Sequence, residues 1–520
     1  MVGRARSWWG WGWADQALSD LECRQLAAVL PGLRAEPIPV PPLAQLQLPA
    51  PRIAAPRSLG GWCSQTTPDR AGHTYGKAYR DVLRALRGEL HSAPDLVAYP
   101  GTEADVVNLL HWASEANLAV IPYGGGSSVV GGVEYRGGDH AGVVSLDLSG
   151  FGQVLEIDDV SRAARIQAGT FGPALEDQLR PHGYTLRHFP QSFEFSTLGG
   201  WLATRAGGHF ATLYTRIDDF VESLRVITPA GSSESWRLPG SGAGPSPDRL
   251  FLGSEGALGV ITEAWLRVQD RPRFKASGVV RFTDFVSALD AVRAVAQSGL
   301  HPSNCRLLDP GEALFSGAAS GEHSVLVLGF ESVAGPVDGA LAGAIEIAVS
   351  HGGTAHERDG GDAVESWRSG FLRMPYLRDG LARMSGIAET FETACTWDRA
   401  AHLCTAVRSG VGAALTQVCG APGIVNCRIT HVYPDGPAPY FTVIAPGRQG
   451  SEIAQWDEIK AAASEILHRH RATITHHHAV GRDHRPWYDQ QRPDLFAAVL
   501  TAAKQVLDPH SVLNPGVLIG

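Results

Sequence analysis

The most constraining feature of this 520-residue sequence is a run of glycines that directly follows an apolar segment. Leu118–Pro122 predicts a buried strand, and the chain continues through Tyr123 and glycines 124–126 to Ser127 and Ser128. Consecutive glycines let backbone N–H groups turn inward without a Cβ, so such a loop can surround a pyrophosphate. The spacing matches neither the Rossmann GxGxxG nor the P-loop pattern, and for the loop alone a flexible turn is the alternative.

Two further segments rich in glycine and hydroxyl side chains occur downstream of this loop. One runs from Ser192 to Gly208, and the other runs from Gly253 to Glu263, where it enters an apolar strand. Three such loops in one domain predict a single extended ligand that is contacted at several points.

The order of the expected elements indicates an α/β domain followed by an α+β domain, and the chain as a whole is assigned to the α+β class. From residue 91, short apolar runs alternate with helical periods, and Thr102 with Asp105 predicts the N-cap of a helix that reaches about residue 116. An earlier helix is expected near His73–Leu90. Arg271–Arg273, with its central proline, is the expected boundary to the α+β domain, which extends to residue 465.

Composition argues against several classes of partner. Charged residues make up 19%, the net charge is −9, and no long basic run occurs, so we expect no nucleic-acid partner. Seven scattered cysteines argue against a disulfide framework and a zinc ribbon. The first residues lack the continuous apolar segment of a signal peptide, so we expect a cytoplasmic protein. Peripheral contact with a membrane surface and a homodimer stay open.

The three loops also carry a resemblance. PYGGGSS at 122–128, SFEFSTLGG with TRAGG within 192–208, and GSEGALGVITEA at 253–264 resemble loops of the vanillyl-alcohol oxidase type flavoproteins. The resemblance implies an N-terminal segment at 1–90, a two-subdomain FAD-binding domain of the PCMH type at 91–270, an inserted cap (substrate) domain on an antiparallel sheet at 271–465, and a C-terminal segment at 466–520 that returns to the flavin.

The resemblance implies FAD as the cofactor. Several relatives attach FAD through a histidine of the glycine loop, and because this loop has none we expect non-covalent FAD. Arg205 is expected to reach the flavin pyrophosphate. The residues assigned to FAD are Pro122, Tyr123, Gly124, Gly125, Gly126, Ser127, Ser128, Gln191, Ser192, Phe193, Glu194, Phe195, Ser196, Thr197, Thr204, Arg205, Ala206, Gly207, Glu255, Gly256, Ala257, Leu258, Gly259, Val260 and Ile261.

Motifs along almost the whole chain resemble the alkyldihydroxyacetonephosphate synthase family. They are WGW, HFPQSFEFSTLGGW, NCRLLD, ETFETACTWDR, NCRIT, THHHAVG and DPHSVLNPGVL. The resemblance implies a transferase of ether-lipid biosynthesis that exchanges the acyl group of acyl-dihydroxyacetonephosphate for a fatty alcohol through a flavin N5 adduct. The alternative is an FAD-linked oxidase or dehydrogenase of a 2-hydroxy acid or another alcohol.

The same resemblance implies a set of catalytic residues. Tyr440 falls on the acid/base tyrosine of the family, and Arg378 falls on an arginine beside the substrate phosphate. A tyrosine base needs a pKa well below about 10, and Arg378 would lower it if it lay close. The alternatives are packing for Tyr440 and an ion pair with Asp379 for Arg378. The other implied site residues are His188, Arg306, His476, His477 and His478.

The histidine run at 476–478 admits a second interpretation, a metal site. Adjacent histidines on a strand alternate between its two faces, so the three cannot easily share one ion, and no metal is assigned. The chain departs from the family pattern at Gln191, Thr390, His431 and Pro439. These departures concern the substrate more than the flavin.

Overall fold

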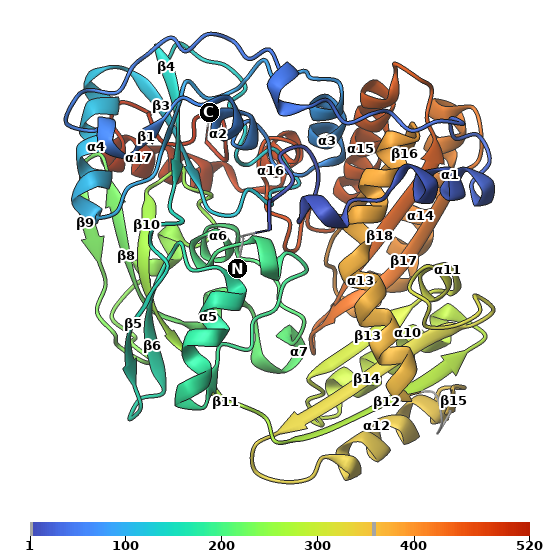
Figure 1. Ribbon diagram of the computed structural model, residues 1–520. Coiled ribbons are helices and arrows are strands. Elements are labelled where there is room, and N and C mark those ends of the chain that lie inside the picture. The colour runs from blue at the N-terminus through green and yellow to red at the C-terminus, as the bar shows by residue number, and fades with distance from the viewer. Residues whose placement is uncertain (1–3, 356–359, 520) are drawn as a thin grey trace.

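The computed structural model describes residues 4–355 and 360–519, and Figure 1 shows its arrangement. Two smaller sheets stand on one side of the molecule, and a seven-stranded sheet with its helices stands on the other. The N-terminal segment crosses between the two sides, and the C-terminus returns to the first. No helix within the described ranges has the length and apolar character that crossing a membrane requires.

The first sheet produces the glycine loop. Its strand order is β1-β2-β4-β3, with β2 and β3 parallel to β4 and β1 antiparallel to β2. The helix α4 (Glu103–Glu115) packs on β3, and Thr102 and Asp105 form the predicted capping box at its start. The strands are β1 (Cys63–Ser64), β2 (Leu96–Ala98), β3 (Leu118–Tyr123) and β4 (Gly142–Asp147).

The second sheet is antiparallel and has five strands in the order β5-β6-β10-β8-β9. Its strands are β5 (Val154–Asp158), β6 (Ala163–Gln167), β8 (Val221–Thr228), β9 (Gly231–Glu234) and β10 (Val260–Arg267). The helices of this region are α5 (Gly172–Leu179), α6 (Leu198–Thr204), α7 (Ala211–Tyr214), α8 (Ile217–Phe220) and α9 (Asp248–Phe251). A short pair, β7 (Tyr184–Thr185) and β11 (Gln269–Asp270), leads to the next unit.

The third sheet is antiparallel throughout, in the order β15-β12-β14-β13-β17-β18-β16. Its strands are β12 (Phe274–Phe282), β13 (Asn304–Leu308), β14 (Ser324–Ser332), β15 (Thr354–Ala355), β16 (Gly386–Glu392), β17 (Ile424–Val432) and β18 (Pro437–Pro446). Its helices are α10 (Phe285–Gln297), α11 (Pro310–Phe315), α12 (Asp338–Ser350), α13 (Gly360–Arg383), α14 (Trp397–Cys419) and α15 (Glu452–Arg469). The predicted α+β class with an inserted antiparallel unit is confirmed.

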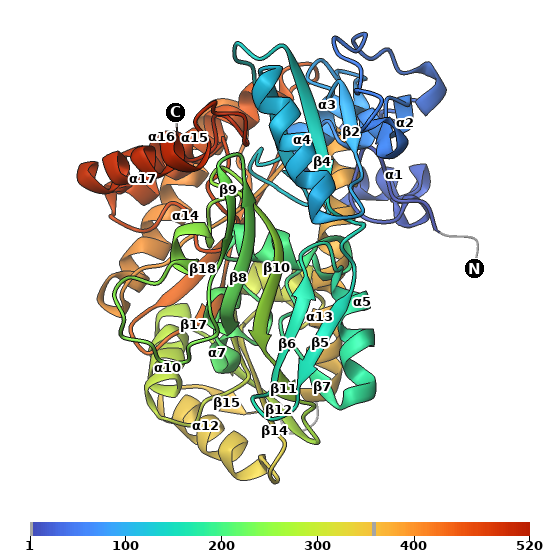
Figure 2. The ribbon, with the colours of Figure 1, turned by 90° about the vertical axis from the view of Figure 1, so that its left-hand side faces the viewer.

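The two ends of the chain pack into the cores of different sheets. Trp9 is buried in the core of the seven-stranded sheet, whereas Val512 and Leu513 are buried in the core of the first sheet. Figure 2 shows the C-terminal helix α17 beside the strands β8 and β9. The terminal helices are α1 (Asp20–Val29), α2 (Thr67–Gly72), α3 (Tyr79–Leu86), α16 (Arg485–Gln491) and α17 (Asp494–Leu507).

The helix expected near His73–Leu90 is confirmed only in part, because α3 spans Tyr79–Leu86 alone. Residues 73–78 form an irregular segment between α2 and α3. In that segment Gly76 passes so close to the glycine loop that an added Cβ would lie 2.2 Å from the backbone oxygen of Ser128. The Lys77 N–H also donates to that oxygen at 2.6 Å, so a tertiary contact with the loop holds residues 76 and 77 outside the helix, which begins only at Tyr79.

Candidate active site

A cavity of about 290 Å³ lies where the three larger sheets meet. Pro122 at the end of β3, Val260 at the start of β10 and Tyr440 on β18 all line it. The three glycine-rich segments, which are far apart in the sequence, therefore converge on one space.

The first glycine loop lines this cavity over its whole length, from Pro122 to Ser128. A Cβ on Gly125 would lie 1.8 Å from the backbone oxygen of Phe195, and Gly126 adopts a φ of +66°. Glycine is therefore required for the loop to lie against the second segment. The Arg6 side chain donates to the Gly125 carbonyl at 2.9 Å and ties the N-terminal segment to the loop.

The third segment is fixed to both the first loop and the C-terminal segment. A Cβ on Gly256 would lie 2.8 Å from the Pro122 ring. The Glu255 carboxylate accepts the N–H groups of Val480 and Gly481 at 2.9 and 2.8 Å. Burial raises the pKa of Glu255 to about 7, although both N–H groups favour its charged form.

Most of the residues assigned to FAD line the cavity. Those that line the cavity are Pro122, Tyr123, Gly124, Gly125, Gly126, Ser127, Ser128, Gln191, Ser192, Ser196, Thr197, Thr204, Ala206, Gly207, Glu255, Gly256, Gly259, Val260 and Ile261. Those that do not are Phe193, Glu194, Phe195, Arg205, Ala257 and Leu258.

For two of the residues that do not line the cavity, contacts elsewhere explain their position. Arg205 ends α6 in the left-handed conformation and forms an ion pair with Asp218 at 2.9 Å. Its side chain does not line the cavity, which corrects the expectation that it reaches the flavin pyrophosphate. Phe195 packs edge-on against Trp11 and Trp13 of the N-terminal segment. Its side chain supports the second loop from behind.

Three neighbouring strands build the polar end of the cavity around Tyr440. Glu392 on β16 and Arg428 on β17 each pair directly with Tyr440 on β18, so the three side chains stand in one cross-strand row. The Arg428 guanidinium carbon lies 3.9 Å from the Tyr440 ring centre, and its Nη1 donates to Glu312 at 2.8 Å. Both Tyr440 and Arg428 are buried.

The electrostatics of Tyr440 differ from the expectation. Burial raises the pKa of the phenol, and Arg428 and a hydrogen bond with Thr390 oppose that shift. The cation that contacts the phenol ring is Arg428, not Arg378. The pKa of Tyr440 in the ligand-free protein therefore lies above its ordinary value, not below it.

Arg378 forms the ion pair that the sequence offered as the alternative, and its side chain also reaches the cavity. Its Nη2 donates to Asp379 at 2.7 Å, as the ion-pair alternative predicted, and its Nη1 donates to the Lys77 carbonyl. The residue also lines the cavity. Asp379 in turn accepts the Trp11 N–H at 2.5 Å, so the N-terminal segment and α13 hold the guanidinium in place together.

The histidine run lies in an irregular loop and not on a strand, which corrects the expectation. The cause is the buried Glu392 carboxylate, which accepts the backbone N–H groups of His476, His477 (3.1 Å) and His478 (2.8 Å). Although burial raises the pKa of Glu392, attraction to these histidines holds it well below its usual value. Burial lowers the pKa of His478 to about 3, even with Glu392 nearby.

The three histidines face different surroundings. His477 and His478 line the cavity, with ring centres 6.2 and 5.6 Å from that of Tyr440. His476 lies behind them, and its Nε2 is 2.9 Å from the Tyr433 hydroxyl. The run thus splits between the cavity wall and its support.

Of the remaining two predicted site residues, one lines the cavity and the other does not. Arg306 lines the cavity, and burial together with Arg428 lowers its pKa to about 9. His188 does not line the cavity: it is 1% exposed and its ring packs 5.0 Å from Trp201. Burial lowers the pKa of His188 to about 3.

Sequence reasoning left Arg428 out of the site and treated His431 only as a departure. Strand alternation on β17 and β18 places Arg428, Thr430, Tyr440 and Thr442 on the cavity face, and that signal was readable in NCRIT and PYFT. His431 also lines the cavity because the ladder between β17 and β18 shifts register between Ile429 and His431. Such a bulge turns an additional side chain inward, and the sequence pattern does not reveal it.

The glycine loop fits a pyrophosphate. Within residues 4–355 and 360–519, the N–H groups of Gly124, Gly125 and Gly126 donate to no protein acceptor and remain available for phosphate oxygens. A family profile described as an FAD binding domain matches residues 94–235, and one described as the C-terminal domain of FAD linked oxidases matches residues 271–518. The protein is therefore an FAD-dependent flavoprotein that contains both of these domains.

Similarity to curated proteins narrows this class. Alkyldihydroxyacetonephosphate synthase from Dictyostelium discoideum is 32% identical over 478 residues, and that from Trypanosoma brucei brucei is 30% identical over 477 residues. Each alignment covers 86% of this chain and 77% of the relative. The chain belongs to the alkyldihydroxyacetonephosphate synthase family, as its sequence motifs predicted.

Solved structures agree with this assignment. An alkyldihydroxyacetonephosphate synthase structure matches with a TM-score of 0.82 and 26% identity over 98% of both chains. A structure of p-cresol methylhydroxylase shares the fold, with a TM-score of 0.69 and 15% identity over 89% of this chain and 95% of that chain. The predicted FAD cofactor and two-part flavoprotein fold are thereby confirmed.

Proposed function

We propose that this protein exchanges the acyl group of acyl-dihydroxyacetonephosphate for a fatty alcohol, the ether-forming reaction for which its relatives are named. The observation that carries the proposal is that one cavity joins three different surfaces. Glycine loops suited to FAD form the first, a row of cationic and proton-carrying side chains around Tyr440 forms the second, and an apolar wall forms the third.

The cationic surface suits the phosphate of the substrate. Arg306, Arg378 and Arg428 all reach the cavity. Glu312 pairs with Arg428 and Asp379 pairs with Arg378, so these two guanidinium groups are held in fixed orientations. Planar guanidinium groups offer paired donors to phosphate oxygens, and a buried cation beside another gains from an anionic ligand.

The apolar surface suits a long hydrocarbon chain. It is formed by α13 and the neighbouring strands β16 and β18, through Met374, Pro375, Leu377, Leu381, Ala388, Val443 and Ile444. Transfer of a chain from water to such a wall contributes about 0.8 kcal/mol for each buried methylene. A chain of fatty length would therefore gain much of its binding free energy here.

Tyr440 is the proposed proton carrier. Its phenol oxygen would take a proton from the substrate carbon between the carbonyl and the ester oxygen, and would return it later. Burial favours the neutral phenol, so the reaction depends on Arg428 to stabilise the phenolate. His477 and His478, whose ring centres lie 6.2 and 5.6 Å from that of Tyr440, would hold polar groups of the substrate.

We propose that FAD is held without a covalent bond. The glycine loop at 122–128 offers neither histidine nor cysteine, the side chains that commonly attach flavins. When bound, the flavin supplies an electron-accepting ring to the reaction. Treatment with acid should release all of the flavin into the supernatant, whereas yellow colour that stays with the precipitated protein would contradict the proposal.

An exchange assay tests the function. The FAD-loaded enzyme is incubated with acyl-dihydroxyacetonephosphate and a labelled free fatty acid, without added alcohol. We expect label to enter the acyl-dihydroxyacetonephosphate, because departure of the acyl group is reversible before the alcohol adds. In parallel, a panel of 2-hydroxy acids is added anaerobically. Bleaching of the flavin by one of these acids, with no label exchange, would favour an oxidoreductase instead.

A further inference from the structure

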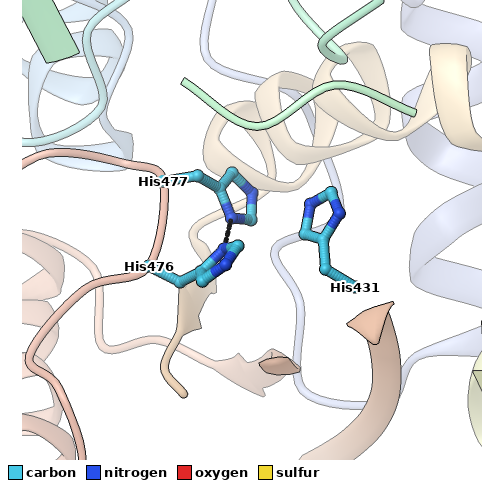
Figure 3. A group of neighbouring side chains, drawn as sticks. All are labelled: His431, His476 and His477. Atoms are coloured by element: carbon cyan, nitrogen blue, oxygen red, sulfur yellow. Dashed lines mark hydrogen bonds between the residues drawn. The ribbon is translucent and has the colours of Figure 1, made fainter. Parts of the chain in front are cut away.

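We propose that His431, His476 and His477 form a binding site for a divalent transition-metal ion, with Zn²⁺ as the reference ion. Figure 3 shows the three rings gathered at one place, His431 from β17 and the other two from the loop after α15. One ring nitrogen from each lies within 4.8 Å of the other two. Imidazole nitrogens are typical ligands for zinc and its neighbours in the first transition row.

The spacing is close to that of a filled site. Zinc–nitrogen distances of about 2.0–2.1 Å in a tetrahedron place ligand nitrogens about 3.3 Å apart. The Nδ1 atoms of His476 and His477 are already 3.0 Å apart. No pair is farther apart than 4.8 Å, so small side-chain rotations bring all three nitrogens to one ion, which replaces the proton between the close pair.

The loop conformation removes the objection that adjacent histidines on a strand face opposite ways. The Glu392 carboxylate gathers the N–H groups of residues 476–478, so the rings of His476 and His477 meet at 82° with centres 5.3 Å apart. The register shift in β17 turns His431 toward the same point. Its Nδ1 is buried and has no hydrogen-bond partner within the described residues.

Groups behind the ligands provide the support that metal sites use. The second ring nitrogen of His476 lies 2.9 Å from the Tyr433 oxygen, which can accept its N–H and orient Nδ1 toward the ion. The Glu392 carboxylate lies 3.8 Å from Nδ1 of His477 and supplies negative charge next to a dication. These contacts match the outer partners that fix metal-binding histidines in other proteins.

The neighbouring group Glu392, His477 and His478 is the weaker candidate. Both Glu392 oxygens are already occupied by backbone N–H groups and by the Thr475 hydroxyl. A metal there would have to displace the bonds that shape the loop. The His431 group needs no such change, and because His431 and His477 line the cavity, a fourth ligand position faces the substrate space.

The test measures metal binding and does not depend on the proposed reaction. FAD-loaded full-length protein is stripped with a chelator and then equilibrated separately with Zn²⁺ and Mg²⁺. Elemental analysis should find one Zn²⁺ per chain and no retained Mg²⁺, and zinc-edge X-ray absorption should show nitrogen neighbours at about 2.0–2.1 Å. Less than a fifth of an equivalent of Zn²⁺, or a shell of oxygen alone, would overturn the proposal.

Matched variants locate the ion. We expect His431→Gln and His476→Gln to weaken Zn²⁺ binding at least about tenfold in competition with a chromophoric chelator, and Tyr433→Phe to weaken it to a lesser extent. His478→Gln should change the affinity less than twofold. His402→Gln removes the exposed ring of a second histidine pair, His402 and the partly exposed His470, whose ring centres are 5.1 Å apart, and serves as the surface control.

Each pattern of results decides the question. Loss of zinc with His478→Gln equal to that with His431→Gln would overturn the assignment, as would loss with His402→Gln. Flavin absorbance and gel filtration check that each variant is folded. If His431→Gln loses FAD, the zinc-edge X-ray absorption spectrum of the wild type and the Zn²⁺ affinity of Tyr433→Phe test the site in its place. Because the zinc readout is separate from the exchange assay, failure of one does not imply failure of the other.

Discussion

Replacement of Gly125 by alanine tests the glycine loop as the FAD cradle. The added Cβ would lie 1.8 Å from the backbone oxygen of Phe195, and even a 3.0 Å contact requires the two backbones to separate by 1.2 Å. Overpacking of this kind costs about 1–3 kcal/mol. Because the strained contact joins two FAD-contacting segments, we expect FAD to bind roughly 5- to 150-fold more weakly.

The assay is the ratio of flavin to protein after gel filtration, followed by titration of the apoprotein with FAD. Gly412→Ala is the matched control, since it lies in α14, and an added Cβ there meets open space. Gly412→Ala should retain stoichiometric FAD, and Gly125→Ala should lose most of it. Equal FAD affinity in the two variants would refute the claim that FAD binding depends on glycine at position 125, where the loop contacts the second segment.

Three further outcomes follow from the same structure. Tyr440→Phe should keep bound FAD and lose about 10²–10⁴-fold in turnover, whereas turnover near that of the wild type would refute the proton-carrier role. Arg428→Met should move the acid limb of the kcat–pH profile to higher pH, because the phenolate loses its cation, and an unmoved limb would contradict this. The pKa of buried His188 is about 3, so between pH 6.5 and 3 only the unfolded chain gains its proton, and stability falls as pH falls. His188→Gln should therefore reduce the loss of unfolding free energy between pH 7 and 5 by about 2 kcal/mol, as measured by denaturant titration, and an undiminished loss would argue against a neutral His188.

Local signals in the sequence were sufficient for the elements and loops that depend on neighbouring residues. The capping pair Thr102 and Asp105 fixed the start of α4, and the glycine-rich segments identified the cavity wall. The start of α3 at Tyr79, later in the chain than expected, could not be read in this way. It depends on the contact between Gly76 and Ser128, which are far apart in the chain.

The polar end of the cavity shows the same limit. The environment of Tyr440 depends on its direct pairing with Arg428 and Glu392, and that register exists only after three strands have assembled. The shape of the histidine loop depends on Glu392, which is 84 residues from His476. A strand was therefore a reasonable expectation from the local sequence and was nevertheless wrong.

The most direct test of the account is transfer from a labelled long-chain alcohol to acyl-dihydroxyacetonephosphate, with the flavin spectrum recorded anaerobically in the same cuvette. The account predicts labelled ether product, one released fatty acid for each ether formed, and oxidised flavin after the reaction. Reduction of the flavin in proportion to substrate consumed, without ether product, would contradict it.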